Sequence, residues 1–139
     1  MIQGRWLEGD LSASERIRMA VFGEAYRESD AMSRYVLVFD DDEQPVGTGR
    51  LWWQDGAFWL GEACVLPEMR GRRYGDLTVR LLIFKALTHS ASELRLIPTP
   101  ETHAFFARYG FRDDPEAPGE MFVPADEVRL SSCCGCGQS

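Results

Sequence analysis

The stretch from Cys64 to Asp76, CVLPEMRGRRYGD, constrains the fold of this chain more than any other segment. It sets an apolar strand end, a proline, a basic glycine-containing loop and the start of a helix in direct succession. The first N–H groups of a helix have no partners within the helix, and the helix dipole is positive there. The arginines of the loop add charge at the same place. The segment therefore predicts an anion-binding site for phosphate or pyrophosphate.

The basic loop contrasts with the acidic chain around it. The 139 residues carry a formal net charge of -7, which repels nucleic acid and anionic membranes. We therefore expect a small anionic ligand, with no nucleic-acid and no membrane partner. The length fits one compact domain with a single core. We assign this domain to residues 1–130 and a flexible cysteine-rich tail, SSCCGCGQS, to residues 131–139.

The N-terminal segment and the cysteines bear on location and on metal binding. MIQGRWLEGD lacks the basic flank and apolar run of a signal peptide, so we expect a cytoplasmic protein. Three of the four cysteines, Cys133, Cys134 and Cys136, crowd into the tail and cannot form a dispersed disulfide framework. Their CxxC spacing could bind a soft metal, form a redox pair or bridge the subunits of a homodimer, while an inert tail is the simpler interpretation. No metal is expected in the domain.

Hydrophobic patterning predicts helices packed on a mixed sheet. The expected strands are 2–7, 35–39, 46–53, 57–66, 93–97, Phe111 and 121–123. The expected helices begin at the capping-box spacing of Ser12 and Glu15, at Tyr74 and at Thr99, and end near Ala25, His89 and Gly110. Residues 27–33 could form a short helix or a loop. In the second helix, an apolar stripe is expected along Leu77, Leu81, Phe84 and Leu87.

Two motifs along the chain carry a family resemblance. Residues 65–67, VLP, precede RGRRYG at 70–75, which is similar to a strand ending in V-x-P followed by [Q/R]-x-x-G-x-[G/A]. Residues 104–111, AFFARYGF, follow a helix and a strand later, in the pattern F-F-x-x-Y-G-F. In this order the motifs resemble those of the GNAT superfamily of acyl-CoA-dependent N-acyltransferases. Arg73 occupies a position where that family usually has glycine.

The resemblance implies a fold and a cofactor. The fold would be α+β, with a central mixed, mostly antiparallel sheet of six or seven strands flanked by helices. Acetyl-CoA, as co-substrate, would lay its pyrophosphate on the N–H groups of residues 72–76. Its pantetheine arm would run in a gap between the strand at Val65 and the strand at 94–97. The implied cofactor-binding residues are Cys64, Val65, Arg70, Gly71, Arg72, Arg73, Tyr74, Gly75 and Asp76.

The resemblance also implies acetyl transfer to a primary amine of a small molecule or peptide, by direct attack in a ternary complex. Such a transfer needs a base for the amine and a proton donor for the leaving thiolate. Glu62 interrupts an apolar strand and is the candidate base, although a solvent-facing Glu62 fits equally well. The family commonly donates the proton from a tyrosine, but here Phe106 holds that position. Tyr109 and His103 are the remaining candidates, against a packing tyrosine and a surface histidine.

A protein of another class would share these motifs. It would bind acyl-CoA or another anion without catalysis, and it could respond to metal or redox state through the cysteine tail. Phe106 favours this alternative because phenylalanine cannot donate a proton, whereas the cofactor elements favour the enzyme. The sequence leaves the acceptor amine unidentified.

Overall fold

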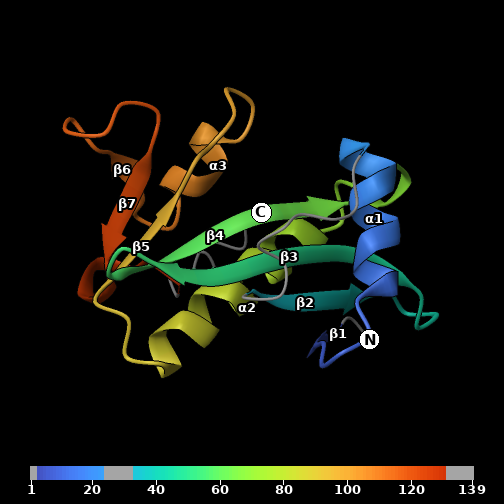
Figure 1. Ribbon diagram of the computed structural model, residues 1–139. Helices are drawn as coiled ribbons and strands as arrows, with labels where there is room; N and C mark the ends of the chain where they lie inside the picture. The colour runs from blue at the N-terminus through green and yellow to red at the C-terminus, as the bar shows by residue number, and fades with distance from the viewer. Residues whose placement is uncertain (1–2, 24–32, 131–139) are drawn as a thin grey trace.

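A mixed sheet forms the centre of the molecule in the computed structural model, which describes residues 3–23 and 33–130. Within these residues the sheet has seven strands in the order β1-β2-β3-β4-β5-β7-β6 (Figure 1). Every neighbouring pair is antiparallel except β4 and β5, which run parallel. The predicted α+β fold with a mixed, mostly antiparallel sheet is therefore confirmed.

The elements follow the predicted order along the chain. The strands are β1 (Gln3–Trp6), β2 (Arg34–Phe39), β3 (Pro45–Gln54), β4 (Ala57–Val65), β5 (Glu93–Leu96), β6 (Arg112–Asp113) and β7 (Met121–Pro124). The helices are α1 (Ser12–Phe22), α2 (Tyr74–Thr88) and α3 (His103–Ala107), with short 3₁₀ turns η2 (Pro67–Met69) and η3 (Ala125–Glu127). The choice between helix and loop at residues 27–33 lies, except for Ser33, outside the described residues, as does the tail at 131–139. None of the described helices is long and apolar enough to cross a membrane.

Helices α1 and α2 cover opposite faces of the sheet (Figure 1). Adjacent residues of a strand point to opposite faces. Thr48 of β3 faces α1, where its hydroxyl lies 2.7 Å from that of Ser14. Gly49 faces α2, and a Cβ at this position would lie 2.8 Å from a methyl carbon of Leu82. The absence of a side chain at Gly49 therefore lets α2 pack close to the sheet.

The helix starts differ from those predicted. Ser12 is the first residue of α1 and Leu11 is its N-cap, so the predicted capping box is wrong. Instead, the Asp10 carboxylate accepts a hydrogen bond of 3.0 Å from the Ser12 N–H. Helix α3 begins only at His103, because the carbonyl of Thr99 accepts hydrogen bonds from two successive N–H groups and forms a separate turn before it.

The buried face of α2 also differs from the predicted stripe. The buried residues are Tyr74, Thr78, Val79, Leu82, Ile83 and Ala86. Phe84 is 60% exposed, so its assignment to the buried stripe is wrong. Each residue advances a helix by about 100°, so Phe84 points away from the face that Leu82 and Ala86 turn to the sheet. The buried face of α2 therefore lies beside the predicted stripe, along residues such as Val79, Leu82, Ile83 and Ala86.

Strands β4 and β5 separate after a short common stretch. They pair from Phe58 with Leu94 to Leu60 with Leu96, and no pairing between them continues beyond that point in the part of the chain that the structure describes. β4 runs on to Val65, and Figure 1 shows the two strands diverging. Within the described residues, the edge of β4 that faces β5 thus has no neighbouring strand beyond Leu60, as the resemblance implied.

Candidate active site

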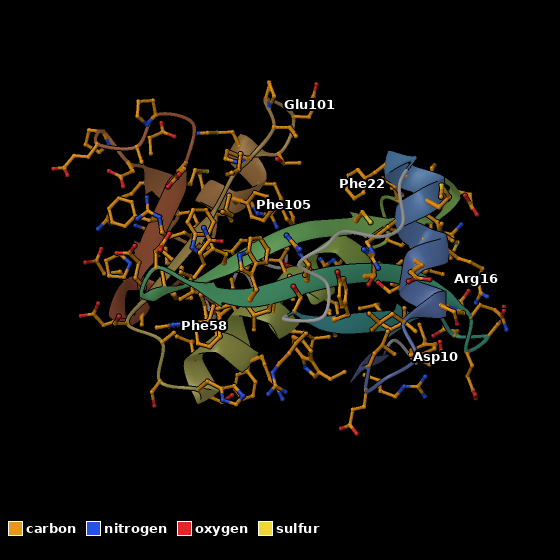
Figure 2. The ribbon with its side chains drawn as sticks, viewed as in Figure 1. Asp10, Arg16, Phe22, Phe58, Glu101 and Phe105 are labelled. Atoms are coloured by element: carbon orange, nitrogen blue, oxygen red, sulfur yellow. The ribbon has the colours of Figure 1, made fainter. Side chains whose placement is uncertain are left out.

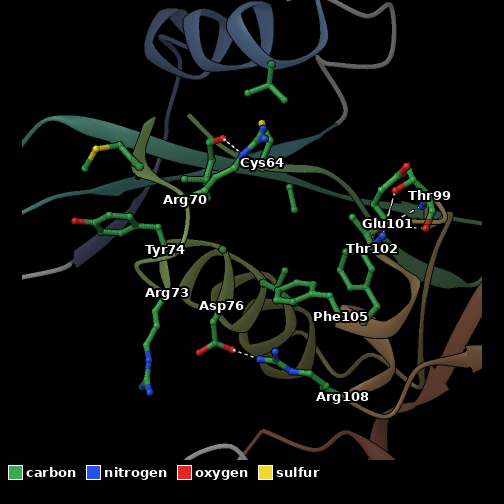
Figure 3. A pocket seen from close by; sticks show the side chains of 18 of the residues that line it. Cys64, Arg70, Arg73, Tyr74, Asp76, Thr99, Glu101, Thr102, Phe105 and Arg108 are labelled. Carbon is green, nitrogen blue, oxygen red and sulfur yellow. Dashed lines mark hydrogen bonds and ion pairs between the residues drawn. The ribbon is translucent and has the colours of Figure 1, made fainter. Parts of the chain in front are cut away.

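A cavity of about 640 Å³ opens where the two strands separate. Its walls come from the end of α1, the end of β4, the loop before α2, the first turn of α2, and α3 with the turn before it (Figure 3). Figure 2 shows Phe22 on α1 and Phe105 on α3, which both line this cavity. Eight of the nine predicted cofactor-binding residues line it as well: Cys64, Val65, Arg70, Gly71, Arg73, Tyr74, Gly75 and Asp76. Arg72 does not.

The loop before α2 leaves the start of the helix open to an anion. Among the described residues, no side chain caps the N-terminus of α2, so the N–H groups of residues 74–76 are available. Arg70 fastens the loop to β4, because its Nε donates a hydrogen bond of 3.2 Å to the Val65 carbonyl. Three guanidinium groups line the cavity, those of Arg70, Arg73 and Arg108. Backbone and side chains therefore both suit a phosphate group.

Arg73 adopts a backbone conformation that favours glycine. Its φ is 70°, in the left-handed region, and it is the N-cap of α2. A residue with a Cβ costs about 1 kcal/mol or more in this region. Glycine at this position would avoid that cost, which is a physical reason for the glycine of the family motif. In this chain the arginine keeps the left-handed turn and adds a positive charge beside the cavity.

Asp76 in the first turn of α2 connects the loop to α3. One carboxylate oxygen accepts a hydrogen bond from the Tyr109 hydroxyl, and the other accepts one of 2.9 Å from Arg80 Nε. A guanidinium nitrogen of Arg108 lies 4.0 Å from the first oxygen (Figure 3). Burial, and then the hydrogen bond to Asp76, raise the pKa of Tyr109. Tyr109 therefore stays protonated with its proton directed to Asp76, and it does not line the cavity.

The α3 side of the cavity is aromatic and polar. Phe105 and Phe106 both line it, so an aromatic ring without a hydroxyl stands where the family motif commonly has tyrosine. The hydroxyls of Thr99 and Thr102, also in the lining, lie 3.1 Å apart. His103 does not line the cavity, and its Nε2 lies 2.8 Å from a carboxylate oxygen of Asp113. The structure therefore brings neither His103 nor Tyr109 to the cavity.

Glu62 lies at an irregularity of β4. Thr48 of β3 pairs with Cys64 of β4, and Arg50 pairs with Gly61. Between these two pairs, β3 advances by two residues and β4 by three. β4 thus carries one extra residue, a β-bulge, at Glu62 and its neighbour. The next residue, Ala63, lines the cavity. The candidate base is therefore placed on the strand segment that borders the site.

Several lining residues could not be found from the sequence. Val21 and Phe22 end an ordinary helix pattern, and Glu101 follows a proline in a turn, so no motif distinguishes them. Phe105 and Arg108 lie within the second motif, which was a usable signal. Among the described residues, no three His, Cys, Asp or Glu side chains are grouped so as to hold a metal ion.

Comparisons with known proteins identify the fold and the family. A family model described as an acetyltransferase (GNAT) domain matches residues 32–113, more than half of the chain. No curated protein matches the sequence. Many solved structures match the fold.

Three of these solved structures illustrate the likeness. A protein from Lactobacillus plantarum proposed to be an N-acetyltransferase has a TM-score of 0.75 and 18% identity, covering 89% of this chain and 98% of that one. The ribosomal-protein-S18-alanine N-acetyltransferase from Escherichia coli has a TM-score of 0.70 and 16% identity, covering 90% and 94%. A GNAT family acetyltransferase from Brucella melitensis in complex with acetyl-CoA has a TM-score of 0.68 and 19% identity, covering 89% and 88%. With the domain match and both motifs at one cavity, this chain belongs to the GNAT acetyltransferase family.

Proposed function

We propose that this protein transfers the acetyl group of acetyl-CoA to a primary amine of a small molecule or peptide, by direct attack in a ternary complex. The observation that carries the proposal is a single cavity that joins the open N-terminus of α2 to the gap between β4 and β5. Acetyl-CoA bound to the Brucella melitensis relative supports the choice of co-substrate. We propose the cytoplasm as the protein's location, because three of the four cysteines are crowded at residues 133–136 and do not form the dispersed framework of a secreted domain.

The chain's own residues fit both ends of an acyl-CoA. The N–H groups of residues 74–76, with Arg70 and Arg73, would hold the pyrophosphate. The pantetheine arm would lie along the edge of β4 beyond Leu60, in the place of an added strand. The thioester would then lie near the point where the strands separate. Acetyl-CoA supplies an activated acetyl group there.

The transfer forms a C–N bond and breaks the C–S bond, and it moves one proton away from the amine. We propose the Glu62 carboxylate as the base that takes this proton. Phe106 has no proton to give, and Tyr109 donates to Asp76. A thiol has a pKa of about 8.5, so a thiolate can leave without a protein acid and take its proton from water. Loss of the family tyrosine is therefore compatible with turnover.

The test follows thiol release from acetyl-CoA with a panel of primary amines, beside direct measurement of acetyl-CoA binding. Glu62→Gln should lower kcat/KM for the amine by about a hundredfold or more and leave acetyl-CoA affinity unchanged. Glu8→Gln, a change at an exposed residue outside the cavity, is the matched control and should match the wild type. Full activity of Glu62→Gln would remove Glu62 from the mechanism. Failure to bind acetyl-CoA would refute the proposal as a whole.

A second candidate function is binding of acyl-CoA without catalysis. The specific observation in its favour is Phe106, which lines the cavity at the position of the family's proton donor. Under this function, acetyl-CoA binds with normal affinity, but no amine releases thiol at a rate above the buffer. The same assay therefore separates the two candidates.

A further inference from the structure

Arg108 brings a positive charge to the cavity from the α3 side, whereas Arg70 and Arg73 lie in the loop before α2 (Figure 3). Resting on the proposed transferase function, we propose that the guanidinium of Arg108 pairs with a phosphate group of acetyl-CoA and holds the co-substrate from the α3 side. Arg108 is thus a further binding residue, outside the loop motif.

The ion pair that Arg108 makes in the structure is weak and replaceable. One guanidinium nitrogen lies 4.0 Å from a carboxylate oxygen of Asp76, and among the side chains that the structure describes this is the only ion pair of Arg108. The side chain of Arg108 is 43% exposed, and exposed ion pairs contribute little to stability. Asp76 has two closer partners, because it also accepts hydrogen bonds from Tyr109 and from Arg80. Asp76 therefore stays compensated when Arg108 turns to a ligand.

The guanidinium is held beside the open start of α2. It lies over the ring of Phe105, 5.2 Å from the ring centroid, and both residues line the cavity. An aromatic face attracts a cation, so Phe105 keeps the charge at the cavity wall. The contact with Asp76 places the same guanidinium at the first turn of α2, where no described side chain caps the N–H groups. A phosphate on these N–H groups would therefore lie within a short side-chain movement of Arg108.

The charge of the co-substrate calls for positive groups on both sides of the helix start. Acetyl-CoA carries a 3′-phosphate as well as its pyrophosphate, whereas the chain as a whole has a net charge of -7 and repels anions. Arg70 already uses its Nε to bind the Val65 carbonyl. Both phosphate groups present oxygens that a guanidinium binds through paired N–H donors. Arg108 therefore suits either phosphate, and a co-substrate that lacks one of them separates the two.

The test measures acetyl-CoA binding by calorimetry. Arg108→Gln should weaken binding about tenfold, as the loss of one charge-assisted hydrogen bond would, and Arg108→Lys should restore part of the affinity. Salt screens charges at an exposed site, so the effect of Arg108→Gln should shrink when the ionic strength rises from about 0.05 M to about 0.5 M. Arg129→Gln removes the same charge at an exposed residue outside the cavity and should bind acetyl-CoA as the wild type does.

Acetyl-dephospho-CoA, which lacks the 3′-phosphate, identifies the group that Arg108 contacts. An equal loss of affinity with both co-substrates in Arg108→Gln would assign Arg108 to the pyrophosphate. A loss with acetyl-CoA alone would assign it to the 3′-phosphate. Either pattern supports a phosphate contact.

The outcomes separate this inference from the function on which it rests. If the wild type and Arg108→Gln bind acetyl-CoA equally, or if the loss is the same at both ionic strengths, the Arg108 inference is wrong while the transferase function stands. If acetyl-CoA binds but no amine releases thiol, the transferase function fails, and the binding measurements still decide the role of Arg108. If the wild type does not bind acetyl-CoA, both are wrong.

Discussion

The Tyr109 hydroxyl makes a buried hydrogen bond whose removal has a calculable effect. Tyr109 has no exposed surface, and its hydroxyl donates to the Asp76 carboxylate. Tyr109→Phe removes this one group and leaves the ring packed. A hydrogen bond to a charged group contributes about 1.5–3 kcal/mol, so the free energy of unfolding should fall by about 2 kcal/mol near neutral pH. For a chain of this length that lowers Tm by about 6–8 °C.

The effect should shrink at alkaline pH. Burial and the bond to Asp76 raise the pKa of Tyr109 in the folded state above its ordinary value of 10.0. Above that value the unfolded chain releases the proton while the folded chain keeps it, so stability is full below about pH 10 and falls by about 1.4 kcal/mol for each further unit. The Tyr109→Phe variant has no hydroxyl at this position, so its stability does not fall for this reason. At about pH 11 the difference between wild type and variant should therefore drop from about 2 kcal/mol to below 1 kcal/mol.

Urea unfolding at the two pH values, followed by far-ultraviolet circular dichroism, measures these differences. Other tyrosines titrate equally in both proteins and cancel. Asp76→Asn is the control background: there Tyr109→Phe should cost only about 0.5–1 kcal/mol, because the charged acceptor is gone. A difference that stays the same at both pH values, or the same cost in both backgrounds, would refute the assignment of this bond.

Two further predictions concern the departures from the family motifs. Arg73→Gly should be about 1 kcal/mol more stable than Arg73→Ala in thermal unfolding, because only glycine adopts the φ of 70° without strain. Both variants should weaken acetyl-CoA binding equally. Equal stability of the two variants would contradict the strained turn. Phe106→Tyr places a hydroxyl in the cavity lining and should raise kcat by about tenfold or more, with an added fall in rate at alkaline pH as that hydroxyl ionises. An unchanged kcat would mean that thiolate protonation does not limit the rate.

Local signals in the sequence were sufficient for the order of the elements and for the loop before α2. Alternation and helical periodicity located the meander, α2 and the order of elements, since these patterns act within one element. The motif at residues 65–75 predicted the open helix start, because a proline restricts the residue before it and a glycine permits a positive φ. Most of the predicted loop residues indeed line the cavity.

Features that depend on two distant segments could not be predicted in this way. Phe84 continues the helical spacing of Leu77, Leu81 and Leu87, which are partly buried, and only the rotation of α2 on the sheet exposes it. The hydrogen bond between Tyr109 and Asp76 joins residues far apart in the chain, so it cannot be predicted from residue type or spacing. It forms only because the end of α3 lies beside the start of α2 in the fold.

The sequence by itself determined the family, the succession of strands and helices and the loop before α2 that lines the cavity. The tertiary structure decided that Tyr109 and His103 lie outside the cavity and that Glu101 and Phe22 belong to its lining. The physical reason is the distance along the chain over which each effect acts. Backbone preferences and periodicity are set by a few neighbouring residues, whereas the contents of a cavity depend on how faces of distant elements pack.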